Sequence, residues 1–141
     1  MSGADASGRE RPLVTLAFSS LRLGGIQRGM LSLAAGILAR GVAVDLLVLD
    51  PQGELRDAVP PGASLVPVGA TRTWRAALPL AGYLRRRRPA AVLASQTHLN
   101  VAMLVARALA RVPTRVVASE HVALDAVLAQ AGGWKERLFP L

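Results

Sequence analysis

Short apolar runs alternate with longer amphipathic stretches along almost the whole chain, and this alternation restricts the fold more than any other feature. The short runs, rich in aliphatic and β-branched residues, are expected to be strands at residues 13–18, 42–49, 64–68, 91–95 and 114–119. Helical spacing of apolar residues predicts helices at 26–40, 74–87 and 99–111, and a single turn around 54–58. Strands and helices that alternate through short connections form right-handed crossovers, so the sequence predicts an α/β fold, a Rossmann-like doubly wound parallel sheet.

For three of the expected strands the sequence predicts a place in the sheet. The run at 42–49 is almost continuously apolar, as expected of a strand that is covered on both faces. Pro67 lies inside the run at 64–68, and because proline cannot donate a ladder hydrogen bond, this strand is expected at an edge. The run at 114–119 is expected to be left open on its far side, where an exposed edge invites pairing with another chain.

Composition narrows the possible functions. The 17 Lys and Arg against 9 Asp and Glu give a formal charge of +8, which favours anionic partners. Aromatic residues make up only 4% and no nucleic-acid recognition motif occurs, so nucleic acid is not an expected partner. The chain has no cysteine, which removes disulfides and thiolate metal sites and makes a cytoplasmic location the simpler interpretation. Residues 1–11 lack the apolar core of a secretory signal and are expected to form a flexible tail, and no apolar run is long enough to span a membrane.

Gly24 and Gly25 lie between the first strand and the first helix. In parallel sheets ligands bind beyond the carboxyl ends of the strands, and backbone N–H groups at a helix N-terminus can hold a phosphate. A glycine pair can equally serve only to make a tight turn, and both interpretations stay open. The dinucleotide fingerprint G-x-G-x-x-G, the P-loop and the nucleophile elbow G-x-S-x-G are all absent, which weighs against dehydrogenases, P-loop enzymes and serine hydrolases.

Polar residues follow the fourth and fifth strands at the same edge. His98 and Asn100 belong to the segment SQTHLN at residues 95–100, and Glu120 and His121 follow the fifth strand. A histidine here could contact a sugar hydroxyl or phosphate or move a proton, or could simply bond nearby backbone at a helix end. The two histidines and Glu120 match no ligand spacing that we can name, so no metal is expected.

Four consecutive arginines, Arg85, Arg86, Arg87 and Arg88, end the second helix. Cations in a last turn complement the helix dipole, so a solvated helix end is the simpler interpretation. The alternative is peripheral contact with an anionic membrane, to which the apolar residues upstream would contribute.

The order of several short motifs resembles the family 4 glycosyltransferases. These are GGIQR at residues 24–28 before an amphipathic helix, RGVAVD at 40–45, SQTHLN at 95–100, and VPTRVVASEH at 112–121. Val42 stands where histidine is common in the family. The resemblance runs from about Leu13 to Leu141 and implies that residues 12–141 are the incomplete N-terminal, acceptor-side half of a GT-B fold.

The family implies retaining transfer from a nucleotide-sugar to a glycan or polyprenyl-linked acceptor, as in the biosynthesis of cell-surface polysaccharides. By resemblance, Gly24 and Gly25 approach the donor diphosphate with Gln27 and Arg28 beside them, and His98 contacts the transferred sugar as the candidate catalytic residue. Asn100, Glu120 and His121 line the same cleft. The resemblance implies no metal or other cofactor, and a cytoplasmic protein that can lie against the inner face of the membrane.

The family's E-x7-E signature belongs to the C-terminal donor domain and does not occur in this sequence. We therefore expect a fragment that has no transferase activity alone. Two other hypotheses remain: a non-catalytic Rossmann-like module that binds an anion or a partner, and an unrelated Rossmann-like nucleotide enzyme, which the missing fingerprint makes the least favoured.

Overall fold

A computed structural model describes residues 11–69 and 73–120 of the 141-residue chain. Strands and helices alternate throughout this part, as the sequence predicts. The expected flexible tail lies outside the described residues except for Arg11. In chain order the elements are β1 (Leu13–Ser20), α1 (Gly25–Ala39), β2 (Ala43–Asp50), the short 3-10 helix η1 (Arg56–Ala58), β3 (Ser64–Pro67), α2 (Thr73–Arg87), β4 (Ala91–Ser95), α3 (Thr97–Ala110) and β5 (Arg115–Ser119).

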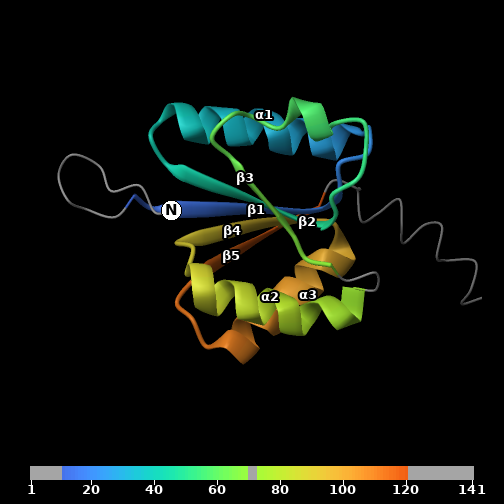
Figure 1. The fold of residues 1–141 in the computed structure, drawn as a ribbon. Coiled ribbons are helices and arrows are strands. Elements are labelled where there is room, and N and C mark those ends of the chain that lie inside the picture. Colours follow the sequence, from blue (N-terminus) through green and yellow to red (C-terminus); the bar gives the residue numbers. More distant parts are fainter. Residues whose placement is uncertain (1–10, 70–72, 121–141) are drawn as a thin grey trace, which may run out of the picture.

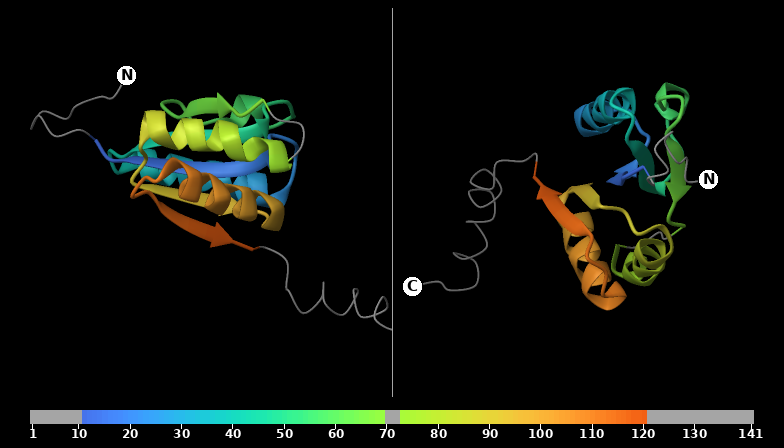
Figure 2. Two further views of the ribbon diagram at one scale, coloured as in Figure 1. Left: turned by 90° about the horizontal axis from the view of Figure 1, so that it is seen from below. Right: turned by 90° about the vertical axis from the view of Figure 1, so that its left-hand side faces the viewer.

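The described strands form one parallel sheet in the order β3-β2-β1-β4-β5. Helix α1 and η1 cover one face of the sheet, while α2 and α3 lie side by side on the other (Figures 1 and 2). The prediction of a doubly wound parallel sheet is confirmed. The edge position expected for the strand that contains Pro67 is confirmed as well, and β5 forms the opposite edge of the described sheet.

Two apolar cores hold the layers together, one on each face of the sheet. Alternation along β1 feeds both: Leu16 and Phe18 pack toward α1, whereas Ala17 packs toward α2 and α3. The α1 side is completed by Met30 and Leu31 of the helix. The residues that α2 and α3 bury are Ala76, Leu80, Ala81, Tyr83, Leu84, Leu99, Ala102, Met103, Ala106 and Ala110.

A polar network lies inside the second of these cores, at the start of β1 and β2. The Tyr83 hydroxyl donates to Asp45 Oδ2 at 2.7 Å and lies 2.6 Å from Thr15 Oγ1. Arg87 donates from Nε and from a terminal nitrogen to the two oxygens of Asp45, each at 3.0 Å. Burial raises the pKa of the Tyr83 hydroxyl well above its ordinary value, and hydrogen bonds to Asp45 raise the pKa of Arg87. Asp45 therefore lies in a mostly apolar strand, and its hydrogen-bond partners Tyr83 and Arg87 both belong to α2.

Helix α3 begins two residues earlier than the sequence predicts, at Thr97 instead of residue 99. His98 consequently belongs to the first helical turn and not to the preceding loop. The other differences between expected and observed ends are of one or two residues, which is the usual uncertainty of a helix or strand terminus.

Candidate functional site

The loops after β1 and β4 separate at the carboxyl edge of the sheet. Strands β1 and β4 are neighbours, with Ala17 beside Ala94, but β1 continues into a helix on one face and β4 into a helix on the other. The two helices therefore begin at the same edge from opposite faces. At this point the Ser95 hydroxyl lies 3.8 Å from the sulfur of Met30, which joins the end of β4 to α1. Such a divergence is where doubly wound sheets bind ligands.

Gly24 and Gly25 form the N-terminus of α1, and neither has a backbone conformation that requires glycine. Gly24 is extended, with φ −176°, and the glycines of the described chain with positive φ are Gly41, Gly53, Gly62 and Gly69. No side chain caps the helix. Apart from the chain neighbours and the nearby backbone of the helix itself, no atom lies within 4 Å of the place where a Cβ on Gly25 would be. The tight-turn interpretation is therefore not supported. A side chain at residue 25 would therefore meet open space at the helix N-terminus, where the first backbone N–H groups have no partner within the helix.

Gln27 and Arg28 flank this helix end in different ways. The carboxamide of Gln27 folds back over Gly24, so that a Cβ on Gly24 would overlap Gln27 Oε1. Arg28 is exposed and lies at a groove of about 620 Å³ between α1 and the segment that contains η1. The remaining lining residues are mostly apolar: Leu31, Ser32, Ala35, Leu55, Ala58, Pro60 and Pro61. The sequence did not predict this groove, because it depends on how the loop after β2 packs against α1.

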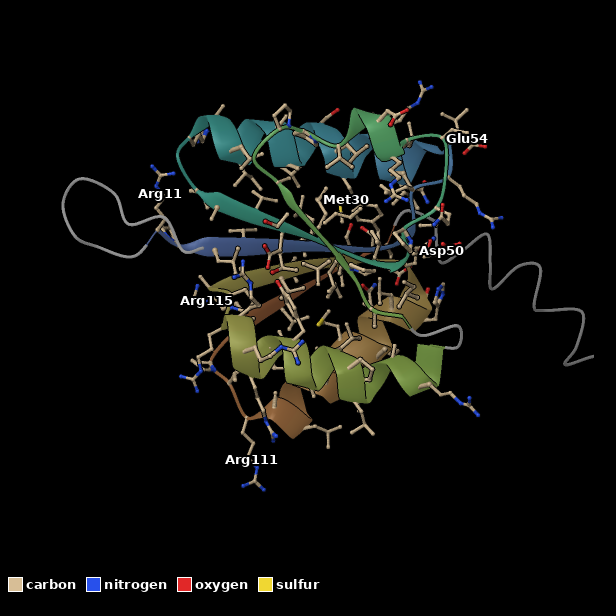
Figure 3. All side chains as sticks on the ribbon, in the orientation of Figure 1. Arg11, Met30, Asp50, Glu54, Arg111 and Arg115 are labelled. Carbon is tan, nitrogen blue, oxygen red and sulfur yellow. The ribbon has the colours of Figure 1, made fainter. Side chains whose placement is uncertain are left out.

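The loop after β1 is held by the loop after β2. The Leu23 N–H donates to Glu54 Oε2 at 3.0 Å, and the Leu55 N–H donates to the Leu21 carbonyl at 2.9 Å. Gly53 has φ +145° and packs so closely that a Cβ would overlap the backbone of Leu21. Hydrogen bonds from its own backbone N–H and from Leu23 lower the pKa of the Glu54 carboxyl. In Figure 3 Glu54 and Asp50 lie at this end of the sheet and Arg11 and Arg115 at the other.

Gln96 carries the clearest backbone strain at the site. It precedes α3 with φ 87° and ψ 133°, a conformation that side chains other than glycine rarely adopt. Its Oε1 atom is buried and has no hydrogen-bond partner among the described residues. Strain of this kind persists where the surroundings impose it, and it is concentrated at functional sites. Sequence reasoning did not single out Gln96, because nothing in its local pattern announces a positive φ.

Asn100 and Glu120 are brought together, as the sequence predicted for this edge. Asn100 is 5% exposed, and its Nδ2 donates to Glu120 Oε1 at 2.8 Å and to the Ser119 carbonyl at 3.1 Å. The Thr97 hydroxyl donates to the other Glu120 oxygen at 2.9 Å. Because the amide nitrogen is bound twice, the amide orientation is fixed and Oδ1 is left buried without a described partner. The hydrogen bonds of Asn100 and Glu120 therefore link the end of β5 to the first turn of α3.

The two histidines differ in what can be said of them. His98 is exposed in the first turn of α3, on the same edge as Gly25. His121 lies outside the described residues, so its predicted place in the cleft stays a prediction. Within residues 11–69 and 73–120 no group of three histidine, aspartate or glutamate side chains is arranged to hold a metal ion.

The four arginines at the end of α2 do not share one role. Arg87 binds Asp45, as described above. Arg85 donates to the carbonyls of Leu109 at 2.9 Å and Ala110 at 3.4 Å, at the C-terminus of α3. Arg85 and Arg87 are exposed, as the interpretation of the cluster as a solvated helix end expects, but they also bind a neighbouring helix end and a buried carboxylate, which that interpretation did not include. Arg86 and Arg88 are exposed.

A second cavity, of about 390 Å³, lies at the opposite, amino edge of the sheet. Arg11, Gly41, Gly62 and Arg87 are among its lining residues, together with the first residues of β2. Arg87 already forms an ion pair with Asp45. The cavity therefore attracts an anion less strongly than two unpaired arginines would. The amino edge is also not the edge at which such sheets bind ligands.

No described helix is both long enough and apolar enough to cross a bilayer. Among curated proteins, none matches the sequence of this chain. The family model described as a glycosyl transferase 4-like domain matches residues 24–141, which begin at the Gly24 helix end and include the β4–α3 loop and Glu120. Together with the five-stranded parallel sheet, this match shows that the chain belongs to the glycosyltransferase 4-like family.

Proposed function

We propose that this chain is the acceptor-side domain of a retaining glycosyltransferase, which transfers a sugar from a nucleotide-sugar to a glycan or lipid-linked acceptor. The observation that carries the proposal is the helix end at Gly25. No side chain caps this end, a Cβ on Gly25 would meet open space, and the backbone geometry does not require its glycines. A diphosphate is the ligand class that such a helix end favours.

The carboxyl edge carries the carboxylates of Asp50, Glu54 and Glu120, and the groups there that favour an anionic donor are the helix N-termini and Arg28. Helices α1 and α3 both direct their N-termini to this edge, so the positive ends of two helix dipoles face the same region. Arg28 adds a full charge beside the first of them, and neither helix has an acidic residue in its first turn. In this proposal the protein itself neutralises the diphosphate, and no metal is required.

His98 is the proposed contact to the transferred sugar. Its exposed place in the first turn of α3 puts the residue on the same edge as Gly25, and the strained Gln96 backbone lies two residues before it. The hydrogen bond between Asn100 and Glu120 would keep this helix end in a fixed position while a sugar binds. Gln27, Glu120 and His121 complete the proposed binding residues.

The acceptor is proposed to be lipid-linked, with the domain working at the cytoplasmic face of a membrane. Arg86 and Arg88 are proposed for this contact, because they are exposed and are not held by Asp45 or by the end of α3 as Arg87 and Arg85 are. Turnover by this polypeptide alone is not expected, because its sequence lacks the E-x7-E signature of the donor side.

Equilibrium binding of nucleotide-sugars to three forms of the chain tests the proposal. Gly25→Leu fills the open space above the helix end and is expected to weaken binding of a nucleoside diphosphate about tenfold or more. His98→Ala is expected to weaken binding of the nucleoside diphosphate-sugar but not of the nucleoside diphosphate without sugar. Gly36→Leu, in the middle of α1 with similar free space, is the matched control.

Equal affinity of the Gly25→Leu and Gly36→Leu variants would contradict a diphosphate at this helix end. Tight binding of simple anions with no preference for a nucleotide-sugar would instead favour a non-catalytic binding module.

A further inference from the structure

The outer surface of the α2–α3 layer combines exposed leucines and valines with arginines, and neither of the two helices contains an acidic residue. On α3 the exposed apolar residues recur at helical spacing: Val101 is 57% exposed, Leu104 51%, Val105 45% and Leu109 46%. They form one stripe on the face turned away from the buried residues of the same helix. Leu78 on α2 is 74% exposed. We call the four residues on α3 the apolar stripe.

The side chains of the apolar stripe follow one another along the helix and are not isolated exposed residues. From Val101 to Leu109 the stripe extends about 12 Å along the helix, at 1.5 Å per residue. Single exposed apolar residues are common on proteins, but a continuous patch on one helix face indicates an interaction surface.

The charges around the stripe identify the kind of partner. Between Asp57 and Glu120 the sequence contains no acidic residue, and the basic residues in this segment are Arg72, Arg75, Arg85, Arg86, Arg87, Arg88, Arg107, Arg111 and Arg115. Arg75 and Arg86 share the exposed side of α2 with Leu78, and Arg111 follows Leu109 at the end of α3. Figure 3 shows Arg111 pointing away from the sheet, below α3. A surface with apolar side chains and only positive charge fits the interface of an anionic bilayer.

We propose that the α2–α3 layer docks on an anionic membrane, with the apolar stripe inserted between the lipid headgroups. Nucleic acid would not account for leucines and valines at the centre of the surface, and a second copy of the chain would bring like charges together. The stripe begins one turn after His98, so a docked chain would hold the β4–α3 loop near the headgroups. The purpose of this docking, access to a lipid-linked acceptor, rests on the proposed function, whereas the docking itself does not.

Flotation of the 141-residue chain with vesicles tests the docking surface without any sugar. We expect the chain to bind vesicles that contain about one third phosphatidylglycerol in phosphatidylcholine, and not phosphatidylcholine alone. The double variant Leu104→Glu, Leu109→Glu is expected to lower the partition coefficient about tenfold or more. Arg86→Gln and Arg88→Gln are each expected to lower it roughly fivefold.

Matched controls lie on the opposite face of the sheet. Leu33 on α1 is 41% exposed, so Leu33→Glu makes the same change outside the proposed surface. Arg56→Gln in η1 removes an exposed arginine there. Both controls should bind vesicles as the unchanged chain does, and thermal unfolding of every variant separates loss of binding from loss of folding.

Four results would overturn the proposal. These are no binding to anionic vesicles, equal loss of binding in the stripe and control variants, self-association that the Leu104→Glu, Leu109→Glu variant abolishes, and a preference for a single-stranded oligonucleotide over vesicles. Each of them leaves nucleotide-sugar binding at Gly25 untouched, so failure here is distinguishable from failure of the proposed function.

Discussion

Arg87 reaches from the last turn of α2 to both oxygens of Asp45 in β2, with two hydrogen bonds of 3.0 Å. The Asp45 side chain is 1% exposed and the Arg87 side chain is 39% exposed. Solvent therefore reaches the ion pair from the Arg87 side and screens it only in part. The bond joins α2 to the first residues of β2, near the amino edge of the sheet. It also ties one arginine of the cluster to a buried carboxylate.

Replacing Arg87 with Gln is expected to lower the free energy of unfolding by about 3 kcal/mol, because it leaves the buried Asp45 carboxylate with Tyr83 as its remaining near partner. Urea unfolding measures the change. Arg86→Gln is the control, since this exposed neighbour should change stability by less than about 0.5 kcal/mol. Equal stability of the two variants would show that the Asp45–Arg87 pair contributes nothing.

Acidification is expected to release the loop that leads into Gly24. The folded-state pKa of Glu54 is lowered below the ordinary 4.5, so its carboxylate stabilises the loop above that pH and loses this effect as the pH falls through the lowered value. The amide proton of Leu23, which Glu54 accepts, should therefore shift in NMR spectra with a midpoint below 4.5.

The Glu54→Gln variant supplies the control for this titration, because a carboxamide does not ionise in that range. Its Leu23 amide should show no such step. A midpoint above 4.5, or the same step in both proteins, would contradict the bond between Glu54 and Leu23.

Gly53→Ala is expected to destabilise the chain by about 2 kcal/mol or more. Its φ of +145° is a region that L side chains rarely occupy, and the new Cβ would overlap the backbone of Leu21 and Arg22. Gly25→Ala adds the same methyl group in open space and should cost nothing, since alanine is the better helix former. Equal unfolding midpoints of the two variants in urea would refute the close packing of the two loops.

Gln96→Gly is expected to stabilise the chain by about 1 kcal/mol. Relief of the positive φ and removal of the unpaired buried Oε1 each contribute roughly 1–3 kcal/mol, and the greater flexibility of glycine in the unfolded chain offsets part of this. Gln27→Gly in the first turn of α1, by contrast, should destabilise by up to about 1 kcal/mol. If both changes destabilise equally in urea unfolding, Gln96 is not strained.

The sequence was sufficient for the elements and for the edge at which the candidate site lies. Apolar periodicity predicts the strands and helices locally, and Pro67 excludes a central position for the strand that contains it. Parallel connections between the strands place Gly25, His98 and Glu120 at the same edge of the sheet. Each of these inferences needs only local pattern and the handedness of crossovers.

The missed features all depend on contacts between segments far apart in the chain. The bond of Arg87 to Asp45 spans 42 residues and that of Leu23 to Glu54 spans 31, and neither spacing has a local signal. The positive φ of Gln96 is imposed by its surroundings, and the sequence gives it no glycine. The apolar stripe escaped notice because exposure of Leu104 and Leu109 follows from which face of α3 the sheet covers.

The most direct measurement is an amide NMR titration of the chain with a nucleotide-sugar, which maps where the ligand binds. Binding by the glycosyltransferase site proposed here predicts shifts confined to the carboxyl edge, at Gly25, Gln27, Arg28 and His98. Shifts at Gly41, Gly62 and Arg87 around the amino-edge cavity, with none at Gly25 and His98, would contradict it.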